Sequence, residues 1–149
     1  VVDCDVHQGD GTAAILAGDP TVFTFSIHGA KNYPFKKQQS DLDIELPDRT
    51  GDDDYLAALE RGLHETLARA EPELVVYLAG ADPYEHDRLG RLALTRDGLA
   101  RRDRLVLATL RARRIPAAIA MAGGYARDLA DVVDIHFNTV AIAAELART

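Results

Sequence analysis

Residues 1–12, VVDCDVHQGDGT, join an apolar run to a cluster of polar side chains. The run over residues 1–4 is short and β-rich, which predicts a buried strand. Asp3, Asp5 and His7 follow one another at a spacing of two, so in an extended chain their side chains share one face. This stretch therefore predicts a strand that ends in a polar segment rich in ligand side chains.

Short apolar runs of this kind alternate with helical patterns along the whole chain. Strands are predicted over residues 1–4, 21–27, 41–46, 74–79 and 117–121, and helices over 12–17, about 55–67, 94–113 and 129–146. Such alternation predicts βαβ units and a largely parallel sheet, in which ligands bind beyond the carboxyl ends of the strands. We therefore expect an α/β protein of one domain, or part of one.

The composition narrows the class of partner. The chain has 149 residues, of which 47% are hydrophobic and 28% are charged, as in ordinary globular proteins. Its net charge of -7 argues against a nucleic-acid surface, and no apolar run is as long as a membrane span. Cys4 is the only cysteine, which excludes an internal disulfide and favours a cytoplasmic location. We expect no nucleic-acid partner and no membrane partner.

Neighbouring carboxylates after the first strand predict a cation. Burying Asp3 and Asp5 together is costly unless a positive charge neutralises them, and Asp with His suits zinc or another first-row metal. A calcium-binding EF-hand loop is excluded, because it needs glycine at Gln8 and glutamate at Ala14. The run also resembles a haloacid-dehalogenase-type phosphohydrolase, with Asp3 as nucleophile beside magnesium, but His7 then has no role. A helix-capping role would explain only one of the acids.

The strand predicted over residues 74–79, LVVYLA, is followed by a further ligand. Asp82 comes after its end, behind two small residues that permit close approach of the backbone to a ligand. Together Asp5, His7 and Asp82 would give zinc three protein ligands and leave a fourth position open, as in catalytic zinc sites. Three nearby polar residues are expected at the rim of this metal site or as hydrogen-bonding partners in it: Glu85, His86 and Asp87.

The strand predicted over residues 117–121 ends in a glycine pair and a tyrosine, in the run AIAMAGGYA. Tyr125 can donate a hydrogen bond to negative charge that develops on a carbonyl oxygen. Taken alone, this motif is more typical of a turn with a packed ring. A metal site at the same edge of the sheet favours the catalytic interpretation.

The three motifs at these strand ends together resemble one family. The runs DCDVHQGDGT, GADPYEHDRLG and AGGY match the DxDxH-x-G-x-GT, GxD and GGGY patterns of the zinc-dependent histone deacetylases. The resemblance covers residues 1 to about 146 and is greatest to the class IV branch and its bacterial amidohydrolase relatives. It implies the arginase/deacetylase fold, which is a three-layer αβα arrangement around a parallel sheet.

The resemblance implies a zinc centre for amide hydrolysis. Its ligands would be Asp5, His7 and Asp82. Tyr125 would stabilise the oxyanion that forms when water activated at the metal attacks the acyl carbonyl. The substrate would be an acyl-lysine peptide or an acetylated amine, and the glycines that line it would be Gly123 and Gly124.

The resemblance also implies a structural monovalent cation, K⁺ or Na⁺, behind the zinc. Its ligands, partly through backbone oxygens, would be Asp3, Asp5, His7, Ser26 and Ile27. The remaining histidines match nothing catalytic. His28 is expected to be structural, and His64 and His136 are expected in the core or on the surface.

Two features depart from the family pattern. The family's tandem His-His acid–base pair precedes the DxDxH strand, and this chain begins at that strand. We therefore expect residues 1–149 to be the C-terminal portion of the catalytic domain, and to be catalytically incomplete without the N-terminal half. Unpaired strand edges and apolar helix faces would bind that missing half or a second copy of the chain. Ala122 also stands where the family commonly has a glycine.

Overall fold

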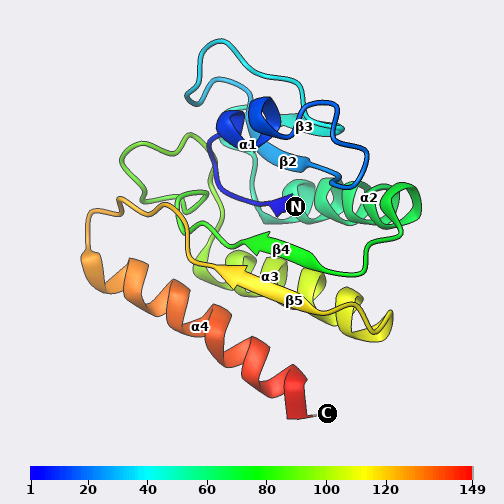
Figure 1. The fold of residues 1–149 in the computed structure, drawn as a ribbon. Coiled ribbons are helices and arrows are strands. Elements are labelled where there is room, and N and C mark those ends of the chain that lie inside the picture. Colours follow the sequence, from blue (N-terminus) through cyan, green and yellow to red (C-terminus); the bar gives the residue numbers. More distant parts are fainter. Residues whose placement is uncertain (149) are drawn as a thin grey trace.

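The computed structural model describes residues 1–148 and contains a five-stranded sheet (Figure 1). In chain order the strands are β1 (Val2–Asp3), β2 (Phe25–Gly29), β3 (Leu42–Leu46), β4 (Val75–Leu78) and β5 (Ala117–Ala120). The helices are α1 (Asp10–Ile15), α2 (Asp52–Ala70), α3 (Arg96–Ala112) and α4 (Leu129–Arg148). The prediction of an α/β fold is confirmed, and the elements lie close to their predicted ranges except at the start of β2.

All neighbouring strands pair in parallel, in the order β3-β2-β1-β4-β5. The chain builds outward from β1 to β3 and then crosses back to place β4 on the other side of β1. This reversal is a topological switch point, where parallel sheets leave a crevice for ligands at the carboxyl ends of the strands. The carboxyl ends of β1 and β4 are therefore where the fold favours a site.

The strand β2 begins at Phe25, later than the sequence pattern predicts, because side chains bond to the backbone before it. The carboxylate of Asp19 accepts hydrogen bonds from the amide and the hydroxyl of Thr21, at 2.8 and 2.6 Å. The carboxylate of Asp41 does the same for Thr24, at 2.8 and 2.9 Å. Such side-chain bonds compete with strand pairing, so the regular strand starts only after Thr24.

The helices α2 and α3 cover one face of the sheet, and α1 lies on the other (Figure 1). Val2, Phe25 and Tyr77 lie side by side in register and are buried beneath α2 and α3. Gly62 lets α2 approach closely, because a Cβ atom there would lie 2.5 Å from the Phe25 ring. Full burial of a leucine contributes about 1.5–3 kcal/mol. The leucines buried in this layer include Leu59, Leu63, Leu67, Leu99 and Leu110.

The helix α4 packs against α3 and leaves an apolar stripe uncovered. Ile135 and Ile142 are buried on the packed side. The exposed stripe consists of Leu129, Val133, Phe137 and Val140, whose exposed fractions lie between 56% and 73%. The neighbouring strand β5 forms an edge of the sheet. The expected unpaired strand edge and apolar helix face are therefore present. Among the described helices, none combines the length and apolarity needed to cross a membrane.

Candidate metal centre

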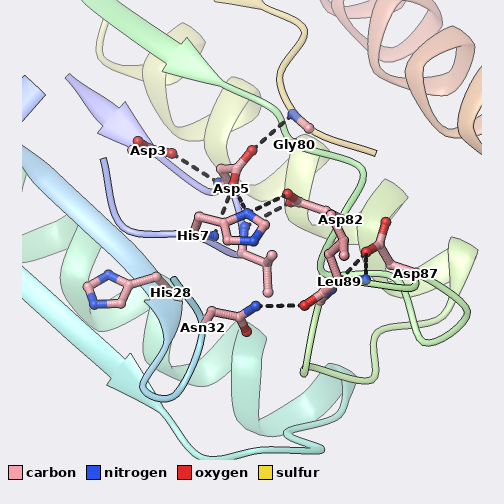
Figure 2. Close-up of polar contacts among 12 residues, drawn as sticks. Asp3, Asp5, His7, His28, Asn32, Gly80, Asp82, Asp87 and Leu89 are labelled. Atoms are coloured by element: carbon pink, nitrogen blue, oxygen red, sulfur yellow. Dashed lines mark hydrogen bonds and ion pairs between the residues drawn. The ribbon is translucent and has the colours of Figure 1, made fainter. Parts of the chain in front are cut away.

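Three ligand-competent side chains converge at the switch point between β1 and β4 (Figure 2). Asp5 and His7 follow β1, and Asp82 follows β4. Because β1 and β4 pair directly, with Asp3 opposite Leu78, the two segments leave the sheet side by side. One carboxylate oxygen from each aspartate of the cluster and one ring nitrogen of the histidine all lie within 4.8 Å of one another. The structure thus brings together the three residues that the sequence motifs single out.

Backbone amides that follow two strands, β1 and β5, orient the carboxylates. The Val6 amide donates to Asp82 at 2.8 Å, so this aspartate is tied to the segment that carries the other two ligands. Asp5 accepts from the amides of His7 and Gly123, each at 2.9 Å. The Nδ1 atom of His7 lies 3.1 Å from a carboxylate oxygen of each aspartate. These oxygens and this nitrogen are the atoms that could bind a metal ion.

Two glycines make room for this convergence. A Cβ atom at Gly80 would lie 2.8 Å from the Asp5 Cα atom, and one at Gly123 would lie 2.3 Å from an Asp82 carboxylate oxygen. Both distances are too short for packed atoms, so a larger residue at either position would displace part of the cluster. At Gly124 a Cβ atom would instead meet a side chain of α4 at 2.8 Å. Of the predicted substrate-lining pair, Gly123 therefore packs directly against the metal-competent carboxylates.

The electrostatics of the cluster favour a cation between its carboxylates. A hydrogen bond to Asp5 and a weaker contribution from a hydrogen bond to Asp82 raise the pKa of His7 to about 10. Without a metal the imidazole therefore carries a proton. Burial raises the pKa of Asp82 to about 6 and the pKa of Asp3 to about 7. Crowded, buried carboxylates of this kind are stabilised by a positive charge. The set of two carboxylates and one imidazole fits zinc, with a fourth position left for another group.

Zinc binding is therefore expected to release protons and to strengthen as the pH rises. His7 holds a proton up to its pKa of about 10, whereas zinc binds the neutral ring. Below that pKa the proton competes with the metal, so each pH unit should raise the apparent affinity about tenfold per proton released. Chelator competition between about pH 7 and pH 9, corrected for protonation of the chelator, measures this slope. A constant affinity across this range would contradict a raised pKa for His7 in the metal-free site.

Known proteins resemble this chain in sequence and in fold. The model of the histone deacetylase domain matches residues 1–148. The chain belongs to the histone deacetylase family. An uncharacterized protein of Picosynechococcus sp. is 52% identical over 136 residues, which cover 91% of this chain and 45% of that protein. Histone deacetylase 2 of Arabidopsis thaliana is 33% identical over 136 residues, which cover 89% of this chain and 35% of that protein.

Solved structures of deacetylases share the fold of this chain. The acetylpolyamine aminohydrolase of Burkholderia pseudomallei has a TM-score of 0.81 at 24% identity, over 97% of this chain and 44% of the other. The histone deacetylase Clr3 has a TM-score of 0.79 at 23% identity, over 97% of this chain and 26% of the other. The expected deacetylase fold is thereby confirmed. The chain spans less than half the length of each of these relatives.

Tyr125, in the deacetylase-like AGGY run, comes two residues after Gly123, which contacts the cluster. Tyr125 is 54% exposed, and both its backbone amide and its carbonyl form hydrogen bonds. The Tyr125 amide donates to Asp87 at 2.6 Å, and the carbonyl accepts from the Arg88 amide at 3.1 Å. Because Gly123 donates to Asp5, the segment that carries the phenol starts at the cluster. The oxyanion-stabilising role of Tyr125 stays a prediction.

The other histidines lie outside the cluster of this deacetylase-family chain. His28 is fully buried, and its Nδ1 atom lies 2.9 Å from the Ser26 hydroxyl, which agrees with a structural role. His86, expected at the rim, is exposed and packs edge-on against Tyr84. Two histidines remain: His64 is exposed on α2, and His136 is half-buried on α4.

The residues expected to bind a monovalent cation lie on two neighbouring strands, β1 and β2, or just after β1. The register places Asp3 opposite Ser26, and both are buried. Asp3 also accepts a hydrogen bond from the Asp5 amide at 3.0 Å. Ile27, the next residue of β2, is fully buried. Binding of K⁺ or Na⁺ at these positions stays a prediction.

Sequence reasoning missed a buried arginine behind the cluster. The Nη1 atom of Arg102 donates to the Gly80 carbonyl at 2.5 Å and to the Cys4 carbonyl at 3.4 Å, just before the two ligand segments. Its Nε atom donates to Asp103 at 2.9 Å, so the buried charge is paired. Helical spacing could have indicated that Arg102 is buried, because it lies three residues after the buried Leu99 on α3. It fixes the backbone of both strand ends from which the ligands emerge.

Proposed function

We propose that this protein is a zinc-dependent amide hydrolase that removes acetyl or other acyl groups from lysine or a related amine. One observation carries the proposal. In a chain of the histone deacetylase family, one ligand atom each of Asp5, His7 and Asp82 lies within 4.8 Å of the others, beyond the carboxyl ends of β1 and β4. The segment that carries Tyr125 begins at this cluster, because the Gly123 amide donates a hydrogen bond to Asp5. Metal ligands and a hydrogen-bond donor are among the groups that amide hydrolysis needs.

Each residue of the site has a proposed part in the reaction. A bound zinc ion would polarise the acyl carbonyl and lower the pKa of water. Asp5, His7 and Asp82 would hold the ion, and the two carboxylates would balance its charge. The Tyr125 hydroxyl would donate a hydrogen bond to the acyl oxygen as negative charge develops there. Gly123 would keep the tyrosine segment close to the ligands.

General acid–base catalysis is proposed to come from another part of the protein. Within residues 1–148 the histidine of the cluster is His7, which would be occupied as a ligand. We propose that a tandem His-His pair lies upstream, as in the family pattern, and that this chain is the C-terminal portion of the domain. A general base must lie within hydrogen-bond reach of the water that attacks, so the upstream half would have to pack beside the cluster.

The surface proposed to bind the upstream half is the edge strand β5 together with the exposed stripe of α4. A helix that is apolar on two faces packs against two neighbours, and among the described residues α3 covers one of them. Burial of the stripe in a larger domain would remove Phe137, which is 69% exposed, from water. A second copy of the chain would use the same surface.

The proposed substrates are cationic amines that carry an acyl group. The net charge of -7 favours a cationic substrate over an anionic one. Of the similar proteins, one is named an acetylpolyamine aminohydrolase and another a histone deacetylase. An acetylated polyamine and an acyl-lysine peptide are therefore the two substrate classes to test. We propose a cytoplasmic location, without a nucleic-acid or membrane partner.

Release of acetate by the complete, zinc-loaded protein tests the proposal. We expect hydrolysis of at least one of the two acetylated amines, loss of activity with a chelator, and recovery with zinc. Magnesium-dependent hydrolysis of a phosphate ester, without amide hydrolysis, would instead support the phosphohydrolase alternative with Asp3 as nucleophile. The burial of Asp3, whose exposed fraction is 4%, argues against that alternative, because a nucleophile must reach its substrate.

A further inference from the structure

The carboxylate of Asp87 binds three backbone amides from two separate segments. One oxygen accepts from Leu89 at 2.8 Å and from Gly90 at 2.7 Å, which closes the turn that follows Asp82 (Figure 2). The other oxygen accepts from the amide of Tyr125 at 2.6 Å, 38 residues further along the chain. Hydrogen bonds to an ionised carboxylate are about twice as strong as neutral ones. Asp87 therefore joins the turn to the tyrosine segment.

A second set of contacts holds the tyrosine segment in the same place. The carbonyl of Tyr125 accepts from the backbone amide and the side-chain Nε atom of Arg88, at 3.1 and 3.2 Å. Asp87 also pairs with Ala126 as an isolated antiparallel bridge. The Tyr125 side chain is itself 54% exposed, so its place depends chiefly on its backbone.

The turn that Asp87 closes is anchored from two sides. The buried Asn32 donates to the Leu89 carbonyl at 2.9 Å, which ties the turn to the segment after β2 (Figure 2). Gly90 packs so closely against the backbone of a proposed metal ligand that a Cβ atom there would lie 2.1 Å from the Asp82 carbonyl oxygen. The turn is therefore a fixed base, and Asp87 connects the tyrosine segment to it.

We propose that Asp87 is a positioning residue, which fixes the place of the Tyr125 phenol relative to the metal centre through the Tyr125 amide. This inference rests on the proposed function, in which the phenol donates to the developing oxyanion. Rates are sensitive to such placement, and a displacement of about 1 Å can cost about 100-fold. Within residues 1–148, the hydrogen bonds of the Asp87 carboxylate go to Leu89, Gly90 and Tyr125, and none goes to a metal ligand.

The test is Asp87→Asn in the complete, zinc-loaded protein, alone and combined with Tyr125→Phe. Asparagine keeps one acceptor oxygen for the turn but presents an NH₂ group toward the Tyr125 amide, so the connection is lost while the turn remains. We expect a kcat at least about tenfold lower with little change in KM, and no further loss when the change is added to Tyr125→Phe. The Tyr125 amide should exchange its hydrogen at least about tenfold faster, with unchanged zinc affinity.

Asp48→Asn is the matched control. Asp48 pairs with Arg91 at 2.5 Å in the same region, so the change removes an equal charge without touching the tyrosine segment. It should alter neither kcat nor the exchange of the Tyr125 amide. An equal loss of kcat from Asp87→Asn with and without the Tyr125 hydroxyl would overturn the proposal, and so would unchanged exchange. Full activity of Tyr125→Phe alone would overturn the proposed role of the Tyr125 hydroxyl, and this inference with it.

Discussion

Asp82→Asn is expected to lower the zinc affinity of the protein more than about 100-fold, since even the loss of a group that only orients a metal ligand costs about 10–100-fold. Asp82 is 1% exposed, and its carboxylate would contribute both a ligand oxygen and a negative charge. The amide of asparagine keeps the same shape and an oxygen that can accept from Val6, so the fold should survive. Zinc content after dialysis and chelator competition measure the loss.

Glu85→Gln is the matched control for this change. Glu85 is exposed, lies three residues after Asp82, and is outside the metal-competent cluster. The control removes the same charge and should leave zinc affinity unchanged. Zinc binding by Asp82→Asn that is as tight as in the unaltered protein would show that Asp82 is not a ligand.

Tyr125→Phe is expected to act on turnover rather than on metal binding. The change should lower kcat of the complete enzyme about 100-fold or more, as removal of one oxyanion-stabilising donor does in other enzymes. It removes the hydroxyl alone, and the backbone bonds to Asp87 and Arg88 remain. KM and zinc affinity should change little, because the phenol acts on charge that develops in the transition state. Turnover of an acetylated peptide or polyamine that is unchanged by Tyr125→Phe would contradict the assignment.

The ligand cluster could be predicted because each ligand follows a recognisable strand. The apolar runs at residues 1–4 and 74–79 indicate buried strands, and parallel strands place their carboxyl ends at one edge. Local pattern does not say which strands are neighbours. The pairing of β1 with β4, which brings Asp82 to Asp5, depends on the packing of the whole sheet. The family resemblance implied that Asp5, His7 and Asp82 share one metal site, but it specified no strand pairing.

Contacts between distant segments were outside the reach of sequence pattern. Asp87 reaches Tyr125 across 38 residues, and Asn32 reaches Leu89 across 57. Arg102 is fully buried, although arginine is seldom buried unless it is paired. Helical spacing indicates an inward position for it, whereas the basic composition of its helix indicates a solvated face. Its partners decide between the two orientations: they are the carbonyls of Cys4 just after β1 and of Gly80 just after β4, and the carboxylate of the adjacent Asp103.

Zinc binding by Asp5, His7 and Asp82 is the claim on which the proposed function depends. Its most direct test is the metal content of the purified complete protein, together with anomalous scattering at the zinc absorption edge. We predict about one zinc ion per chain, located among these three side chains and lost in Asp82→Asn. A protein that holds magnesium beside Asp3 and no transition metal, or that binds zinc elsewhere, would contradict the claim.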